Sequence, residues 1–495
     1  MRTGKKALLA SVSKSFKHVS VFLLSILLAR YLSLEDYGSY LQVMLIATTV
    51  IYFSLMGIPS SIYYFFNRVK NKKEFIKRTV YMIHALAITA VLVVLAISDY
   101  LSEVLNNPEL VDVVFVYILF ILFQIPIKLF EPLMISTNNI MGFVRVNLFF
   151  NILFFFAVAI PLVFLDDIIY VYYSMIVFFA LQYLVVNISL AREYVRFDEK
   201  DNSDADFDEC SLITQLRYSL PIGASGAIAE LSRIIDKIVV SSYFSPADLA
   251  VYARGAMEIP MLSVVINSLG NILMPKFVKS YADNDINNIL IYWHRSTVLI
   301  AIVVYPLMVL MISIGDVLIP MLFTEKFNDS IIIFQIYTLS LVFRITTYDS
   351  IVRAIGQTKM LLRVTFISLV LNLALTIIMI ELIGIIGAPI ATFITILIVR
   401  LEMLRVIKNL LNISFIDVFP WLKLVKILLV SLCALVFVYP LMSLNLMLIV
   451  KFFVLSVVYG VAYLFCLRFF SVLDNDEINS LGSVIPQKYL MVLKK

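Results

Sequence analysis

The chain has 495 residues, of which 62% are hydrophobic and 15% charged, and its mean hydropathy is +0.98. Soluble globular domains do not reach this balance, so the composition excludes them and indicates a polytopic membrane protein. The net charge of +5 lies in loops between apolar runs, which excludes the basic, aromatic-interleaved patch of a nucleic-acid-binding protein.

Apolar runs of about 20 residues, the length that crosses the hydrocarbon core, recur along the chain. Lipid offers no partner to backbone amides, and the alternation of barrel strands is absent, so we expect each run to be a helix. The fourteen predicted spans are 16–32, 40–66, 79–98, 111–135, 143–164, 168–191, 213–243, 249–273, 290–313, 331–354, 363–381, 385–407, 421–440 and 446–469.

Lysine and arginine predict the orientation. With a cytoplasmic amino terminus, the basic segments that fall on the cytoplasmic side are 1–17, 67–78, 353–363, 400–409 and the carboxyl-terminal tail. The opposite loops are acidic, as in "SDYLSEVLNNPE" (98–109). This asymmetry follows the positive-inside rule, so we expect both termini in the cytoplasm.

The segment 192–210, "REYVRFDEKDNSDADFDEC", interrupts the hydrophobic pattern with seven carboxylates between Asp198 and Glu209. Its spacing fits no calcium loop, so we interpret it as a solvated cytoplasmic linker. It predicts an N-lobe over 1–191 with six spans and a C-lobe over 211–410 with six more. Residues 411–495 then hold two additional spans and a cytoplasmic tail.

The two halves resemble each other. "YLSLEDYGSY" (31–40) aligns with "YFSPADLAVY" (243–252) at an offset of 212 positions, and "NNIMGFVRVN" (138–147) aligns with "GQTKMLLRVT" (356–365) at 218. Since six spans separate the copies, the two halves have the same orientation. The predicted fold is therefore all-α, with about fourteen transmembrane helices in two parallel six-helix lobes around a central cavity, plus two C-terminal helices.

The seventh predicted span carries a stripe of small and charged residues. At about 100° per residue, its members lie within an arc of about 80°. They are Ser219, Gly223, Gly226, Glu230, Arg233, Lys237 and Ser241, with Asp236 to one side. A central charge facing lipid costs several kcal/mol, so the charged half must face protein or water.

Two interpretations of this stripe remain open. Glu230–Arg233 and Asp236 with a neighbour are candidates for structural ion pairs, with Gly223 and Gly226 allowing close helix packing. The alternative is the wall of a water-filled substrate cavity. We favour the cavity, because intramembrane charges usually mark a pathway and several recur in neighbouring spans.

Further charges lie in spans eight and ten. Arg254 and Glu258 are four residues apart in one predicted helix, and Arg344 lies within another. Asp349 and Arg353 are close enough to the inner interface to extend into it. Fixed cations in a cavity indicate an anionic passenger, because guanidinium groups match phosphate oxygens and do not titrate.

The carboxylates have two candidate roles. Glu230, Asp236 and Glu258 either bind a coupling proton or sodium ion or balance the charge of the arginines. Nucleotide loops, serine-nucleophile elbows and metal-spaced His or Cys sets are missing from the sequence, and the three cysteines are scattered. We therefore expect a transporter without a cofactor or metal, and no enzyme.

Four motifs carry a resemblance to a known family. They are "ARYLSLEDYGSY" (29–40), "DKIVVSSYFSPADLAVYARG" (236–255), "RAIGQTKM" (353–360) and "GIIGAPIATFI" (384–394). With the fourteen spans and the repeat, they resemble bacterial polysaccharide flippases, the O-antigen and capsule transporters of the multidrug/oligosaccharidyl-lipid/polysaccharide exporter superfamily.

The resemblance implies a V-shaped cavity between the lobes, lined by spans 1, 2, 7 and 8, and a cargo of undecaprenyl-pyrophosphate-linked oligosaccharide. It assigns the pyrophosphate to Arg30, Arg233, Lys237 and Arg254. It places a monomer in the bacterial inner membrane, beside a polysaccharide polymerase and a chain-length regulator. In the first half the counterpart of "DKIVV" is uncharged until Arg30, so we expect a charge excess in the second lobe.

Three alternatives to this function remain open. A lipid II flippase for peptidoglycan precursors also requires cavity cations. A multidrug and toxin extrusion antiporter predicts acidic cavities, which the cluster of cations disfavours. A membrane scaffold predicts that the charged stripe is fully ion-paired and dry.

Overall fold

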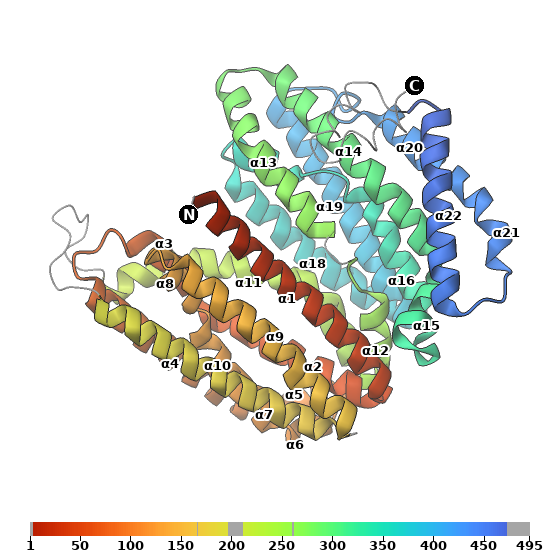
Figure 1. Ribbon diagram of the computed structural model, residues 1–495. Helices are drawn as coiled ribbons and strands as arrows, with labels where there is room; N and C mark the ends of the chain where they lie inside the picture. The colour runs from red at the N-terminus through yellow and green to blue at the C-terminus, as the bar shows by residue number, and fades with distance from the viewer. Residues whose placement is uncertain (1–2, 166, 197–210, 260–261, 473–495) are drawn as a thin grey trace. The chain divides into compact units, whose positions relative to one another are not determined.

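The computed structural model describes residues 3–165, 167–196, 211–259 and 262–472, and every regular element in this part of the chain is helical (Figure 1). Nine segments among these residues are long and apolar enough to cross a membrane. The all-helical, polytopic prediction is confirmed. Most of the predicted acidic linker and the tail beyond residue 472 lie outside the described residues.

The chain divides into two compact units, 1–250 and 251–495, here called the first and second units. The helices of the first unit are α1 (Thr3–Tyr31), α2 (Leu34–Leu55), α3 (Ile58–Phe65), α4 (Lys72–Ala96), α5 (Ser98–Val104), α6 (Glu109–Asp112), α7 (Val114–Ile127), α8 (Phe130–Ser136), α9 (Ile140–Phe164), α10 (Ile168–Arg196) and α11 (Leu212–Tyr243), with α12 (Pro246–Gly255) at the boundary.

The second unit continues with α-helices and short 3₁₀ helices, labelled η. They are α13 (Leu262–Ala282), α14 (Ile286–Ser313), α15 (Gly315–Phe323), η1 (Glu325–Phe327), α16 (Ser330–Leu339), η2 (Ser340–Phe343), α17 (Tyr348–Ala354), α18 (Thr358–Ile383), η3 (Gly384–Ile386), α19 (Gly387–Leu411), α20 (Trp421–Ala434), η4 (Leu435–Phe437), α21 (Tyr439–Met442) and α22 (Leu448–Phe469).

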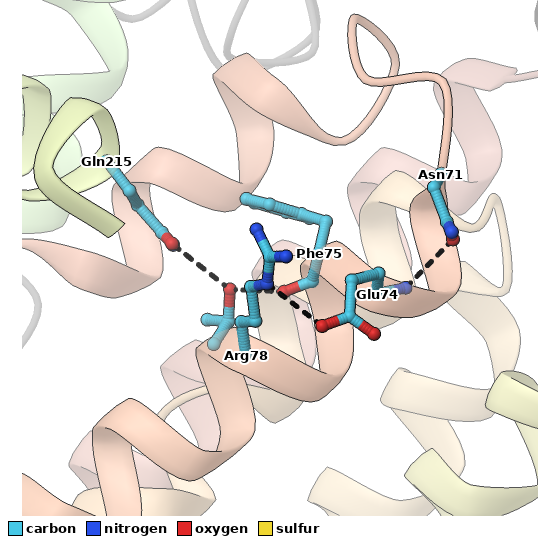
Figure 2. Close-up of polar contacts among 6 residues, drawn as sticks. Asn71, Glu74, Phe75, Arg78 and Gln215 are labelled. Atoms are coloured by element: carbon cyan, nitrogen blue, oxygen red, sulfur yellow. Dashed lines mark hydrogen bonds and ion pairs between the residues drawn. The ribbon is translucent and has the colours of Figure 1, made fainter. Parts of the chain in front are cut away.

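Helix α11 follows the predicted linker, yet it packs against α2 and α3 of the first unit. Buried Gln215 Nε2 donates to Ser61 Oγ at 2.9 Å and to Thr79 Oγ1 at 3.0 Å, so α11 is tied to α3 and α4. Figure 2 shows Gln215 reaching α4 beside the ion pair of Arg78 with Glu74. The contacts of α11 thus place the unit boundary after it, whereas the repeat-based lobe boundary at 211 stays a prediction.

A glycine of α11 allows close contact with the chain between α2 and α3. Gly223 crosses the kink between α2 and α3, where a Cβ on Gly223 would lie 2.3 Å from the Met56 carbonyl carbon. Close crossing of membrane helices requires small residues. The packing role expected of Gly223 is confirmed, whereas Gly226 has nothing within 4 Å of its Cβ position.

The internal repeat is visible in the helix caps. Ser33 Oγ accepts from Asp36 N at 3.0 Å at the start of α2, and Ser245 Oγ accepts from Asp248 N at 3.2 Å at the start of α12. In both copies the serine hydroxyl donates to the aspartate at 2.7 Å. The aligned motifs therefore fold into the same capped helix start.

The second pair of motifs also has one structure. Helices α8 and α17 each have seven residues and are 218 positions apart. Each is followed by a left-handed residue, Asn138 with φ 59° and Gly356 with φ 80°. The next residue donates back five positions, from Asn139 N to Met134 O at 2.8 Å and from Gln357 N to Val352 O at 3.1 Å. The predicted repeat is confirmed at this level.

The repeat extends to the packing inside each unit. In the first unit α7 packs against α4 and α10, and α10 against α9; in the second, α16 packs against α14 and α19, and α19 against α18. Two additional helices, α20 and α22, pack against each other and against α14 (Figure 1). They correspond to the two predicted C-terminal spans.

Several spans predicted as continuous helices are broken in the structure, among them the span 40–66, which divides at Met56 and Gly57 between α2 and α3. The span 111–135 divides after Ile127, and the span 331–354 divides at Arg344–Thr347. The span 249–273 is wrong as one helix, because α12 ends at Gly255 and α13 begins at Leu262. A proline at position 260 supplies no N–H and disfavours continuation of the helix.

Candidate anion-binding site

A cavity of about 230 Å³ lies within the second unit, at the break between η2 and α17. Residues after α12 and side chains of α13, α16, α17 and α19 line it. Its ionisable side chains are those of Arg344, Arg353, Arg400, Glu258 and Asp349. The lining therefore carries three guanidinium groups and two carboxyl groups.

The break itself is fixed by a buried hydrogen-bond cluster. Trp293 is fully buried, and its indole N–H donates to Thr346 Oγ1 at 2.6 Å. Thr297 Oγ1 donates to the same oxygen at 2.7 Å. A buried tryptophan requires such an acceptor. Thr346, in the non-helical break, supplies it and so satisfies the polar side chains of α14. This arrangement turns the chain at Arg344, which lies two residues earlier.

Arg344 and Glu258 form an ion pair across the cavity. Arg344 Nη1 donates to Glu258 Oε1 at 3.0 Å, although the residues are 86 positions apart. Their side chains are 27% and 46% exposed, respectively. A pair this exposed contributes about 0–1 kcal/mol to stability. The pair can therefore open for a guest at low energetic cost.

Arg400 is the most enclosed cation of the cavity wall. Its guanidinium lies 4.8 Å from the centre of the Tyr348 ring, a cation–π contact. Its Nε is buried, and no described residue accepts a hydrogen bond from it. The Thr347 hydroxyl, also in the lining, is buried without a partner among the described residues. Buried polar atoms normally have partners, so both groups have unused hydrogen-bonding capacity at the cavity wall.

The arrangement favours an oxygen-rich anion. Arg400 lies within the electrostatic field of Asp349 and Arg344, and the lining as a whole has one more guanidinium than carboxylate. Arginine binds phosphate and carboxylate oxygens through two parallel N–H groups. No set of three His, Cys, Asp or Glu side chains able to hold a metal occurs among the residues the structure describes.

The predicted charges of α11 and α1 belong to the first unit. Glu230 accepts from Arg233 through two nitrogens, at 2.5 and 3.2 Å, and Arg233 remains 60% exposed. Asp236 is buried, Lys237 is half-buried, and Arg30 is exposed at the end of α1. The stripe thus contains the predicted Glu230–Arg233 pair, with a guanidinium that is still accessible.

The predicted pair of Arg254 and Glu258 on one helical face is wrong, because α12 ends at Gly255. Arg254 lies over the Phe323 ring, 5.5 Å from its centre. Glu258 lies beyond the helix end and contacts Arg344 instead. Of the predicted site residues, Glu258 and Arg344 therefore share the cavity.

Comparison with known proteins identifies the family. The sequence profile described as "Polysaccharide biosynthesis protein" matches residues 27–332, more than half of the chain. The chain belongs to the polysaccharide biosynthesis protein family. No curated protein sequence matches it significantly.

Solved structures show the fold shared by this polysaccharide biosynthesis protein. The lipid II flippase MurJ in an inward closed conformation has a TM-score of 0.73 and 17% identity, over 94% of this chain and 98% of that chain. An inward-facing multidrug resistance MATE family transporter has a TM-score of 0.59 and 15% identity, over 80% of this chain and 96% of that chain. A MOP superfamily transporter from Pyrococcus furiosus, described by the reverse polarity of its binding pocket, has a TM-score of 0.54 and 14% identity, over 81% of this chain and 94% of that chain.

Sequence reasoning missed Arg400 in this family member. It was assigned to the cytoplasmic segment 400–409, yet it lies inside α19 against Tyr348. A signal was available: at the 218-position offset of the repeat, Arg400 corresponds to Gln182, a polar residue in the sixth predicted span. Asp349 and Arg353, assigned to the membrane interface, also belong to the cavity lining.

Proposed function

We propose that the protein is a flippase that moves undecaprenyl-pyrophosphate-linked glycan repeat units from the inner to the outer leaflet of the bacterial cytoplasmic membrane by alternating access. The observation that carries the proposal is the cavity with three arginines, above all Arg400, whose buried Nε has no acceptor among the described residues. A pyrophosphate supplies the oxygens that such donors require. Membership of the polysaccharide biosynthesis family supports a glycan as the rest of the cargo.

The remaining predicted cations have a place in this proposal. Arg30, Arg233, Lys237 and Arg254 contact the cargo's anionic groups outside the cavity described above. Glu230, Asp236 and Glu258 balance these charges or bind a coupling proton or sodium ion. Glu258 already accepts from Arg344, so a phosphate that displaces it frees a carboxylate for a cation. A polymerase and a chain-length regulator then receive the glycan outside.

The fold alone does not decide the cargo, because one fold hosts many functions. The likeness to MurJ makes lipid II the second candidate, and its pyrophosphate would occupy the same arginines. A cation antiporter of the MATE type is disfavoured by the excess of guanidinium groups in the cavity. The reversed pocket polarity in the Pyrococcus furiosus relative illustrates that pocket charge differs within this fold.

The test is the double variant Arg344→Gln/Arg400→Gln. Each charge-assisted hydrogen bond to a charged group contributes about 1.5–3 kcal/mol, so cargo binding should weaken at least about tenfold. Surface glycan should fall accordingly, while lipid-linked repeat units accumulate on the cytoplasmic side. Arg192→Gln, an exposed arginine on α10, is the matched control and should leave surface glycan unchanged.

The outcomes separate the candidates. Normal surface glycan in a folded, membrane-inserted double variant rejects the proposal. Loss of viability with accumulated peptidoglycan precursor assigns the cavity to lipid II. Drug hypersensitivity with intact glycan assigns it to cation extrusion.

A further inference from the structure

A second cavity of the second unit lies between α18 and α19 and is separate from the three-arginine cavity. Its volume is about 640 Å³. The two helices are joined by η3 and run antiparallel, so the start of α18 and the end of α19 lie at the same end of the pair. We call this cavity the α18–α19 groove.

The basic residues of the groove gather at this end. Arg363 lies in the second turn of α18, and Arg405 and Lys408 lie in the last two turns of α19. Glu402, the one acidic residue in the lining, is 3.8 Å from Arg405, and both side chains are exposed. No ion pair to Arg363 or Lys408 occurs in the described part of the chain. The groove therefore has a net charge of about +2.

The rest of the groove is apolar and faces outward. Ile367, Ile398 and Leu401 line it and are 45%, 42% and 47% exposed, respectively. Ile367 is one helical turn beyond Arg363, about 6 Å further along the axis at 1.5 Å per residue. The lining of the groove thus changes from cationic to apolar along α18 and α19, which belong to a stretch apolar enough to cross a membrane.

This pattern matches the two parts of an anionic glycerophospholipid. Its phosphate complements the cations, and an acyl chain covers the exposed isoleucines; basic pockets between membrane helices bind such headgroups. A soluble anion would not explain the exposed apolar half. The first half of the repeat lacks the full set, because Arg405 and Lys408 correspond at the 218-position offset to Asn187 and Leu190.

We propose that the α18–α19 groove binds one anionic phospholipid of the surrounding membrane, with its phosphate on Arg363, Arg405 and Lys408. The bound lipid is a resident of the second unit and is distinct from the cargo. The proposal does not depend on the flippase assignment, since it rests on the groove alone.

The fluorescence of Trp421 can report whether a lipid occupies the α18–α19 groove. Phe415 lines the groove, and its ring stacks on Trp421 at 5.7 Å between centroids, whereas the other tryptophan, Trp293, is fully buried. The full-length protein is reconstituted in phosphatidylcholine vesicles with increasing fractions of brominated phosphatidylglycerol. Bromine quenches indole fluorescence, so the fraction at half-quenching, compared with brominated phosphatidylcholine, measures lipid preference.

We expect a preference for phosphatidylglycerol that falls about fivefold for each basic residue removed by Arg363→Gln, Arg405→Gln or Lys408→Gln. Arg145→Gln changes the repeat counterpart of Arg363 in the first unit and should leave the preference intact. Glu402→Gln removes the competing carboxylate and should increase the preference, a gain that misfolding cannot produce.

Several results would overturn the proposal. The first is an unchanged preference in the triple variant, and the second is an equal loss in Arg145→Gln, which would indicate general surface charge. The third is inorganic phosphate relieving the quenching at concentrations equal to those of the lipid, which would make the groove a soluble-anion site.

Discussion

Gly223 and Gly226 lie three residues apart on α11 but have different surroundings. A Cβ on Gly223 would lie within 3 Å of backbone atoms of Met56 and Gly57, whereas a Cβ on Gly226 would meet nothing within 4 Å. Backbone atoms cannot move aside as a flexible side chain can. The same substitution should therefore have opposite effects at the two positions.

We expect Gly223→Ala to lower the free energy of unfolding by about 1–3 kcal/mol, the range for overpacking. Gly226→Ala should raise it by about 0.4–1 kcal/mol, because alanine restricts the unfolded chain and fits the helix. Thermal unfolding of the purified variants in one detergent measures both. Equal midpoints for the two variants would contradict the observed crossing of α11 with α2 and α3.

The cavity shows how far single residues can be predicted. Arg344 and Glu258 were identified because a charge inside an apolar run is visible in the sequence. The contact between them cannot be predicted from the sequence, because it joins residues 86 positions apart and depends on the end of α12 at Gly255. Arg400 was missed because it begins a basic segment, and counting lysines and arginines does not show how deep each one lies.

At the level of elements, helix type was predictable and helix continuity was not. The break after Ile127 follows a proline, Pro126, and a reader of the sequence can expect it. The corresponding break at Arg344 contains no proline. It is fixed by Trp293 and Thr297 donating to Thr346, and these partners are known only once α14 is packed. Tertiary hydrogen bonds therefore decide an element that local propensity leaves helical.

The repeated helix caps were the most transferable local signal. Ser33 and Ser245 each satisfy the amide three residues later, so Ser33→Ala or Ser245→Ala should cost about 0.5–2 kcal/mol. Ser443→Ala removes an exposed hydroxyl that donates to Pro440 O and is the control. Thermal midpoints of the three variants test the equivalence. A drop at one cap only would show that the aligned motifs are not energetically equivalent.

For the whole molecule, the two halves of the repeat share structural features but differ in charge. The halves share capped helix starts, the short helices α8 and α17 and a common set of packing partners, yet Arg344 and Arg400 correspond to Pro126 and Gln182 at the same offset. The expected charge excess in the second half is thus accompanied by two cavity arginines without a charged counterpart. A duplicated scaffold with one cationic half suits a carrier that holds its anionic headgroup mainly on one side.

The orientation of this scaffold follows from its charges and can be tested with cysteines. The segment 67–78 is basic and the segment 98–109 acidic, so Lys70 should face the cytoplasm and Glu103 the outside. With Cys210, Cys433 and Cys466 replaced by serine, Glu103→Cys should react with a membrane-impermeant maleimide on intact cells. Lys70→Cys should react only after permeabilisation, because the bilayer then no longer excludes the reagent.

The reverse labelling pattern would have consequences beyond topology. Arg363 belongs to a basic segment predicted on the same side as Lys70, so the α18–α19 groove would then take its lipid from the outer leaflet. Cargo would enter the three-arginine cavity from the outside, which is the wrong direction for a lipid-linked glycan assembled in the cytoplasm. The orientation experiment therefore tests which side of the membrane each end of the helices faces, independently of the arginine variants, which test whether the cavity is needed for export.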